Sequence, residues 1–497
     1  SGSGTPLGAA PAAAGVYEAV VDVALDAETT ITLKSGFEIF NGTKYTYKDS
    51  EEKETEYLFG YPIATAEELL KVTGKEKACT KSRGYYLTAD ITIDQTWNIA
   101  GGDFYLDLNG YSITKTGATG SVIYVDTDSS LNLFDTSEDA AGKVTGGKGY
   151  VDGVNDDLSN GGGVYNKGTF NLYGGAITEN TSTNDGGGVM NYGTFNMYGG
   201  EISKNTTKHG GGVYNAAVTS VVNIYDGLIT GNTADTLAGG VFSLNGGPIN
   251  IYGGEISGNT APRGAGMEIR GRGDGTVVLT MTGGKITGNT ATGNGGGIHL
   301  NGDQKMIISG GEISSNTARG NGGGIYTSFG GNQQGSIVMT GGKITGNEST
   351  SRTATTLIGG GGIHSVNGVI NVSGGEISYN KAGNNGGGIL SGHETYISGT
   401  ALIDHNTAEN YGGGINVCYP YCNYKITGGT ISNNHAYRGG GLYNYSASAP
   451  IIRDAKFINN TALYGAGIYQ RLFAGNNGGC CRAFGRRGEA FAYGLIG

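Results

Sequence analysis

Residues 253–261 read GGEISGNTA, and close relatives of this stretch recur along the chain. GGAITENTS begins at Gly174, GGEISSNTA at Gly310 and GGTISNNHA at Gly428. Each copy contains a pair of glycines, then a branched apolar residue and, three positions later, an asparagine. Because the same order of residue types keeps returning, the chain is built from structural repeats.

Glycine-rich turns divide residues 161–470 into units of about 26 residues each. The first unit, residues 161–185, contains the strand-like segments VYN, TFNLY and AIT. No window shows the i, i+3, i+4, i+7 apolar spacing of an amphipathic helix. Short strands at this period predict a β solenoid. The glycine-rich turns open at residues 161, 186, 210, 239, 264, 295, 322, 360, 386, 412, 439 and 465.

Stacking the units places equivalent residues in columns about 4.8 Å apart. One column, from the third strand of each unit, is apolar in every unit and is predicted to fill the interior. An equivalent column from the first strands runs from Val164 to Ile468. The third-strand column consists of Ile177, Ile202, Ile229, Ile256, Ile286, Ile313, Ile344, Ile377, Ile403, Ile431 and Phe457.

An asparagine stands three positions after this apolar residue in every unit. A buried turn leaves backbone groups that need partners, and an asparagine amide both donates and accepts. We therefore expect these side chains to hydrogen-bond one another along the column. The predicted ladder consists of Asn180, Asn205, Asn232, Asn259, Asn289, Asn316, Asn347, Asn380, Asn406, Asn434 and Asn460.

These patterns predict an all-β protein with the architecture of a right-handed parallel β-helix, three short strands to a coil, as in pectate lyases. The hand follows the crossover preference of parallel strands. Residues 1–60 are interpreted as a leader and an irregular segment, and 61–160 as a capping helix and entry coils. Residues 161–470 are the regular β-helix of about eleven coils, followed by an irregular tail at 471–497. Thr65 and Glu68 form a capping-box pattern that predicts a helix at 65–73.

The repeats also resemble known proteins. FINNTALYGAGI, residues 457–468, is similar to the FxxN and GGAI repeats of chlamydial polymorphic outer-membrane proteins. The GGGVYN and GTFNLYGG segments resemble the adhesin-like right-handed β-helix proteins of gut bacteria and archaea, over about residues 85–470. This resemblance implies a secreted or cell-surface protein with an adhesive role.

Composition narrows the possible partners. The net charge is −10 and no basic stripe occurs, which argues against nucleic-acid binding. No run of about 18 apolar residues is present, so no membrane-spanning helix is predicted. Neither a cofactor nor a metal site is predicted, because no ligand set converges in sequence. Cys418 and Cys422 fit a small loop disulfide as well as they fit two unpaired thiols.

The best candidate binding surface is the outer face of the second strand in the first four units. Its tyrosines at one-coil spacing could stack against sugar rings, and the neighbouring amides could bond sugar hydroxyls. Alternatively, the tyrosines form a self-packed ladder that shields the sheet. The residues are Tyr173, Tyr198, Tyr225 and Tyr252 with Asn171, Asn196, Asn223 and Asn250.

A weaker candidate is an outward column formed by Glu268, His299, Tyr326 and His364, in which Glu268 and His299 could act as an acid/base or ligand-binding pair. We expect this column on the exposed wall. Polysaccharide lyases and glycoside hydrolases share the predicted fold. However, the carboxylates do not cluster in the repeats, so no catalytic residue is assigned. The pair Asp156 and Asp157 is expected to be a solvated turn.

The favoured function is therefore a non-catalytic, adhesin-like protein that binds a polysaccharide, a surface glycoprotein or a host matrix. A polysaccharide-cleaving enzyme is the alternative, and a structural spacer or an ice-binding protein is the second. The ice-binding hypothesis depends on one threonine column that follows the asparagines. Residues 272–274 read RGD and are expected to form an exposed turn. The threonine column contains Thr181, Thr206, Thr233, Thr260, Thr290 and Thr317.

Overall fold

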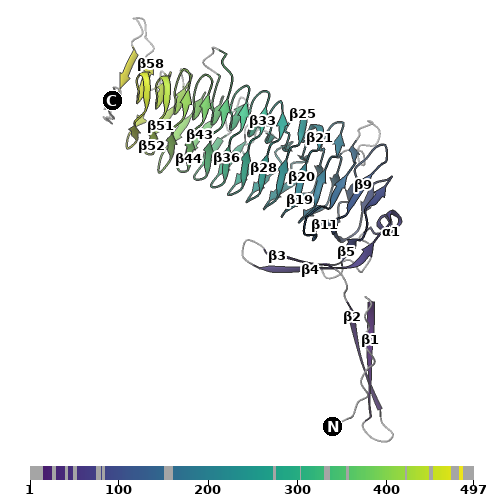
Figure 1. Ribbon diagram of the computed structural model, residues 1–497. Coiled ribbons are helices and arrows are strands. Elements are labelled where there is room, and N and C mark those ends of the chain that lie inside the picture. Colours follow the sequence, from purple (N-terminus) through teal and green to yellow (C-terminus); the bar gives the residue numbers. More distant parts are fainter. Residues whose placement is uncertain are drawn as a thin grey trace.

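The described part of the chain is an elongated solenoid of parallel strands stacked coil upon coil (Figure 1). The strands of each coil are paired with the equivalent strands of the coils before and after it. This arrangement confirms the predicted parallel β-helix. The computed structural model describes residues 15–24, 30–39, 43–48, 53–73, 80, 84–149, 161–271, 276–302, 304–328, 336–353, 358–419, 422–446, 451–471 and 481–484.

The first sheet collects the strand that follows each glycine-rich turn, and its last strand pairs antiparallel. Its strands are β7 (Trp97–Ile99), β10 (Ile123–Val125), β14 (Val164–Asn166), β18 (Val189–Asn191), β22 (Val213–Asn215), β26 (Val241–Ser243), β30 (Met267–Arg270), β34 (Ile298–Asn301), β38 (Ile325–Ser328), β42 (Ile363–Ser365), β46 (Ile389–Ser391), β50 (Ile415–Val417), β54 (Leu442–Asn444), β58 (Ile468–Arg471) and β59 (Cys481–Phe484).

The second sheet collects the next strand of each coil and begins with an antiparallel hairpin, β3 and β4. Its strands are β3 (Thr43–Lys48), β4 (Glu54–Ile63), β5 (Gly84–Leu87), β8 (Asp103–Asp107), β11 (Ser130–Phe134), β15 (Thr169–Leu172), β19 (Thr194–Met197), β23 (Val221–Ile224), β27 (Ile249–Ile251), β31 (Val277–Met281), β35 (Lys305–Ile308), β39 (Ser336–Met339), β43 (Val369–Val372), β47 (Thr395–Ile397), β51 (Tyr424–Ile426) and β55 (Ile451–Ile452).

In most coils the strand of the third sheet has one apolar residue between two polar ones. Its strands are β6 (Ile91–Ile93), β9 (Ser112–Lys115), β12 (Lys143–Thr145), β16 (Ala176–Thr178), β20 (Glu201–Ser203), β24 (Leu228–Thr230), β28 (Glu255–Ser257), β32 (Lys285–Thr287), β36 (Glu312–Ser314), β40 (Lys343–Thr345), β44 (Glu376–Ser378), β48 (Leu402–Asp404), β52 (Thr430–Ser432) and β56 (Lys456–Ile458).

A fourth sheet of short strands follows the asparagine of each coil, so the prediction of three strands to a coil was wrong. The β-branched Thr260, Thr290 and Thr317 lie directly above one another in it. An extended, β-branched residue after the turn favours this extra pairing. Its strands are β13 (Lys148–Gly149), β17 (Thr181–Ser182), β21 (Thr206–His209), β25 (Thr233–Leu237), β29 (Thr260–Ala261), β33 (Thr290–Ala291), β37 (Thr317–Ala318), β41 (Glu348–Ser349), β45 (Lys381–Ala382), β49 (Thr407–Ala408), β53 (His435–Arg438) and β57 (Thr461–Tyr464).

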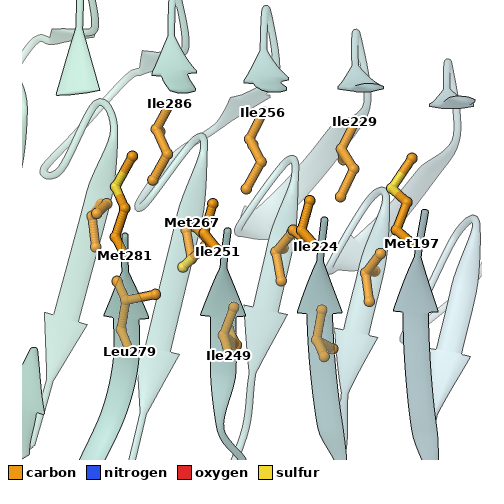
Figure 2. Close-up of a cluster of buried hydrophobic side chains, with 14 of the residues drawn as sticks. Met197, Ile224, Ile229, Ile249, Ile251, Ile256, Met267, Leu279, Met281 and Ile286 are labelled. Carbon is orange, nitrogen blue, oxygen red and sulfur yellow. The ribbon is translucent and has the colours of Figure 1, made fainter. Parts of the chain in front are cut away.

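The predicted apolar columns fill the interior between these sheets (Figure 2). Ile229, Ile256 and Ile286 face Met197, Ile224 and related residues of the second sheet, and each of the five is at most 1 % exposed. Complete burial of such a side chain contributes roughly 1.5–3 kcal/mol. Stacked identical residues therefore give every coil a similar apolar contribution to stability.

The described N-terminal region contains one short helix and a separate pair of strands. Helix α1 (Ala66–Lys71) begins after Thr65, whose hydroxyl accepts from the backbone N–H of Glu68, as the capping box predicted. Leu69 of this helix is fully buried in the core cluster at the first coils. Strands β1 (Gly15–Ala24) and β2 (Thr30–Ile39) form a separate antiparallel pair.

The asparagine column forms the predicted ladder. The Nδ2 of Asn316 donates to Oδ1 of Asn347 at 3.0 Å and to the carbonyl oxygen of Ile286 at 2.8 Å. Its own Oδ1 accepts both from the backbone N–H of Asn289 at 3.0 Å and from Nδ2 of Asn289 at 2.9 Å. The same pattern runs from Asn180 to Asn460. Each amide thus satisfies its own groups together with the backbone of the adjoining turn.

Replacing Asn316 by Ala should destabilise the fold strongly. The N–H and Nδ2 of Asn289 and the carbonyl of Ile286 would lose their partner in a dry interior. We expect the free energy of unfolding to fall by about 3–5 kcal/mol, measured by chemical denaturation followed by circular dichroism. The neighbouring Thr317→Ala, in a half-exposed position, should cost less than about 1 kcal/mol. Equal losses for the two variants would contradict the role of the ladder.

Candidate binding surface

The predicted tyrosine strip is a continuous stack of rings along the outside of the second sheet. Ring centroids of Tyr173, Tyr198, Tyr225 and Tyr252 follow one another at 4.7, 4.8 and 4.9 Å, with interplanar angles of 13° or less. Phe134 extends the stack by one ring, 4.4 Å from Tyr173. Because one residue per coil projects from the same position, the coil spacing brings the rings to stacking distance.

Tyr252 is the last ring of the stack, so no other ring of the strip covers its outer face. The faces of the interior rings lie against one another, so a sugar could reach only their edges. In the next coil Thr282 stands where the strip would continue. The backbone N–H of Thr282 donates to the carbonyl oxygen of Ile251, just as the N–H of Tyr252 donates to that of Ile224. Exposure rises accordingly, to 36 % for Tyr225 and 46 % for Tyr252.

The opposite end of the strip is covered by the β3–β4 hairpin, which projects from the N-terminal end of the rod (Figure 1). Tyr45 of β3 packs edge-on against Phe134 at 5.2 Å. Tyr57 of β4 lies 5.4 Å from the ring of Tyr173, and their hydroxyl oxygens are 3.2 Å apart. Among the described residues, the rings of the hairpin contact Phe134 and Tyr173, and they leave the Tyr225–Tyr252 end of the strip uncovered by a ring.

The amides beside the tyrosines form a second file of hydrogen bonds. Asn196 donates to Asn171 at 2.7 Å, Asn223 to Asn196 at 2.8 Å and Asn250 to Asn223 at 2.9 Å. The file starts one coil earlier, at the buried Asn132. Asn250 is its last amide, because Thr280 occupies the position in the next coil. The amide file and the tyrosine strip thus end in the same coil.

A shallow groove of about 380 Å³ adjoins this open end. Its floor is backbone, because a side chain at Gly253 would bring Cβ to 2.1 Å from the carbonyl oxygen of Tyr225. Burial, with Tyr252 second, raises the pKa of Tyr225, which keeps its hydroxyl protonated as a donor. Sequence reasoning missed the groove, since Glu255 and Lys285 belong to the third strands whereas Asp226 follows Tyr225 of the strip. The lining residues are Asp226, Gly227, Gly253, Gly254, Glu255, Gly284 and Lys285.

The weaker candidates Glu268, His299, Tyr326 and His364 do lie in register in one column, on β30, β34, β38 and β42. The expectation that this column is exposed was wrong. Glu268 is 0 % exposed, and His299 and His364 are 2 % exposed. The glycine-rich turn that precedes each strand folds back over the column. At Gly295, for example, an added Cβ would come to 2.9 Å from Cβ of His299.

The buried Glu268 is held by two basic groups. Its Oε1 accepts from Nε of Arg270 at 2.8 Å, and its Oε2 lies 3.5 Å from Nδ1 of His299. Burial alone would raise the pKa of this carboxyl, but His299 and then Arg270 outweigh it and lower the pKa. The second imidazole nitrogen of His299 lies 3.2 Å from Oγ of Ser328. A group so enclosed supports the fold and cannot reach a polymeric substrate.

Other sequence hypotheses are placed as follows. Cys418 and Cys422 are buried, free thiols, and the Cys418 thiol contacts the carbonyl of Ser391. The threonine column is a single file on the fourth sheet. Among the described residues, no group of three or more His, Cys, Asp or Glu side chains could hold a metal ion. Asp156, Asp157 and the RGD stretch at 272–274 lie outside the described residues.

Sequence reasoning also missed a third asparagine file, on the first sheet. Asn166 donates to Asn191 at 2.7 Å, and Asn191 donates to Asn215 at 2.8 Å. All three are fully buried. The signal was present, because the first strands read VYN, VMN and VYN with asparagine at the same offset.

Comparison with known proteins supports a repeat protein of this kind. Residues 311–328 match the Chlamydia polymorphic membrane protein repeat. This stretch contains both the ladder residue Asn316 and the glycine-rich turn before β38. Searches of curated proteins and of solved structures found no match to the chain. No described helix is long and apolar enough to span a membrane.

The buried column predicts a pH-dependent stability. Burial lowers the pKa of His364 to about 3, whereas the pKa of an unfolded histidine is about 6.5. The contribution of His364 to the free energy of unfolding is therefore complete above a pH of about 6.5. It falls as the pH decreases towards 3, by about 1.4 kcal/mol per pH unit.

The change His364→Leu should remove this component, and Leu390 already occupies the same column one coil later. Chemical denaturation at pH 7 and at a pH of about 5 gives the change in the free energy of unfolding between the two pH values. This decrease should be smaller by roughly 2 kcal/mol in the variant than in the wild-type protein. The exposed His435→Leu serves as the control, and an equal change there would contradict the assignment.

Proposed function

We propose that this β-helix is a surface adhesin-like protein that binds polysaccharide at the open end of the tyrosine strip. The observation that carries the proposal is the uncovered face of Tyr252 beside the groove. An aromatic face next to several polar groups is the usual composition of a site that orients a small ring by stacking and hydrogen bonding. The similarity of residues 311–328 to a Chlamydia membrane-protein repeat supports a location at the cell surface.

In this proposal a pyranose ring lies against the outer face of Tyr252, and neighbouring sugars follow the groove. Asp226 and Glu255 accept hydrogen bonds from hydroxyls, and Lys285 donates one. Asn250 contributes an amide at the point where the file of amides ends. The floor of glycine backbone lets the polymer approach closely, since Gly253 and Gly254 present no side chain.

Binding without cleavage is part of the proposal. The imidazole–carboxylate pair of Glu268 and His299 is enclosed, and general acid–base chemistry needs such groups within hydrogen-bond reach of the substrate. In this proposal the rod holds a polymer, and its stacked coils fix the position of the open end of the tyrosine strip.

The change Tyr252→Ala should abolish retention on immobilised polysaccharide while the thermal unfolding midpoint changes little. The variant loses the stacking contribution of about 0.5–1.5 kcal/mol and, in addition, the apolar area that the ring would bury against the sugar. The measurement is the fraction retained on cellulose, xylan, mannan, pectin and chitin, scored together with new reducing ends released.

Tyr192→Ala is the matched control, because Tyr192 is 39 % exposed and lies outside the strip. Retention that survives in Tyr252→Ala would reject the site. Release of reducing ends by the wild-type protein would instead favour the polysaccharide-cleaving alternative.

A further inference from the structure

A second column of side chains projects from the corner after the third sheet, where the backbone is left-handed. Several coils have glycine there, with φ of 61° to 63° at Gly231, Gly258, Gly288 and Gly346. The other coils carry L-residues at this position with φ of 51° to 57°, namely Glu179, Lys204, Ser315, Tyr379, His405, Asn433 and Asn459. L-residues are disfavoured in this geometry, and the largest side chain at the corner, that of Tyr379, is exposed to solvent.

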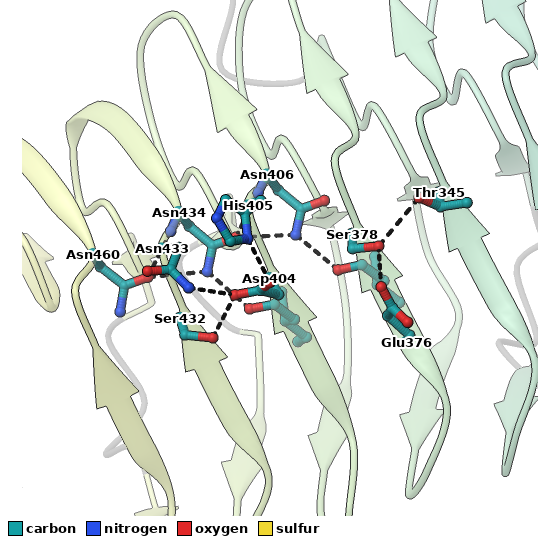
Figure 3. A network of polar contacts seen from close by, with 12 residues as sticks. Thr345, Glu376, Ser378, Asp404, His405, Asn406, Ser432, Asn433, Asn434 and Asn460 are labelled. Carbon is teal, nitrogen blue, oxygen red and sulfur yellow. Dashed lines mark hydrogen bonds and ion pairs between the residues drawn. The ribbon is translucent and has the colours of Figure 1, made fainter.

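A polar network holds this corner in place (Figure 3). Oδ2 of Asp404 is 2.5 Å from Nδ1 of His405. Its other oxygen accepts from Oγ of Ser432 at 2.5 Å and from Nδ2 of Asn433 at 2.8 Å. Burial acts to raise the pKa of Asp404, but these hydrogen bonds together lower it. Because the serine and the histidine bind the same carboxylate, they are not arranged as a hydrolytic triad.

The network fixes an aromatic platform. The ring of Tyr379 stacks on the imidazole of His405 at 4.9 Å and 12°. Tyr379 is 60 % exposed, more than any other described tyrosine. On its other side the preceding coil has Gly346, where an added Cβ would meet nothing closer than Oγ of Ser315 at 3.8 Å. One face of Tyr379 therefore stacks on His405, and the other borders the position where Gly346 places no side chain.

The groups beside this vacancy are polar and balanced in charge. Thr345 directly precedes Gly346 and pairs in register with Ser378. The buried Ser378 hydroxyl donates to Oε1 of Glu376 at 2.6 Å and lies 3.1 Å from Oγ1 of Thr345. Oε2 of Glu376 is 3.6 Å from Nζ of Lys343. A carboxylate held in place, a partly exposed hydroxyl and an ammonium group are suited to the hydroxyls of a neutral ligand.

We propose that the vacant position at Gly346 is a binding subsite for a single neutral pyranose ring. The ring would stack on the free face of Tyr379 at the coil spacing, with Glu376, Thr345 and Lys343 bonding its hydroxyls. A sugar fits better than an aromatic side chain, because polar groups surround the platform. The subsite lies three coils beyond the coil of Tyr252, and it stands independently of the proposed function.

The test uses the full chain and four probes, namely cellohexaose, xylohexaose, mannohexaose and chitohexaose, with binding measured by isothermal titration calorimetry. At least one should bind to the wild-type protein. Tyr379→Ala should weaken that binding at least about tenfold, since it removes the stacking face. Gly346→Tyr should do the same by filling the vacancy, because its ring would stack on Tyr379.

Gly258→Tyr is the matched control for placing a tyrosine at a left-handed glycine position. Gly258 has φ of 61° and similarly open surroundings, and it lies in an earlier coil. It should leave the affinity unchanged. The proposal is overturned if no probe binds, if Tyr379→Ala and Gly346→Tyr bind like the wild type, or if Gly258→Tyr weakens binding equally. Binding lost only in Tyr252→Ala would overturn this subsite while supporting the strip. Preference for a tyrosine-containing peptide would overturn the sugar assignment.

Discussion

The hydrogen-bonding demand of one buried asparagine per coil sets the geometry of the whole protein. An amide such as that of Asn316 is removed from water and needs partners for both its donor and its acceptor. The adjoining coil supplies them through its own asparagine and through the backbone of its turn. This arrangement works only when equivalent corners lie directly above one another. Insertions are consequently placed at other turns, as in the long interval between Gly322 and Gly360.

The interior could be predicted from sequence because it repeats. The isoleucine column and the asparagine ladder each appear at one offset in every unit, and both are present in the structure. The fourth strand was missed because two residues carry too little periodicity to distinguish a strand from a turn. The burial of His299 was missed for a different reason. Alternation along a strand tells which face a side chain takes, but not whether a turn folds back over that face.

The candidate site was predictable only in part. The alternative of a self-packed tyrosine ladder describes the interior rings, which stack on one another. Sugar binding at the open face of Tyr252 stays a proposal. The covering hairpin could not have been foreseen, because the contact of Tyr57 with Tyr173 joins segments that share no repeat. Both surfaces proposed for ligands occur where a column stops, at Thr282 and at Gly346.

The direction of the inter-coil bonds has a mechanical consequence. Backbone hydrogen bonds of a parallel sheet run across the strands, and here the strands run around the rod, so the bonds of all four sheets lie along its length. Tension between the two ends acts along these bonds, and every coil boundary carries it in series, so we expect the coil at a loaded end to separate first. A pull across the rod, such as a polymer held on its flank would exert, loads many coils together. We therefore expect the rod to resist a sideways pull better than a pull along its length.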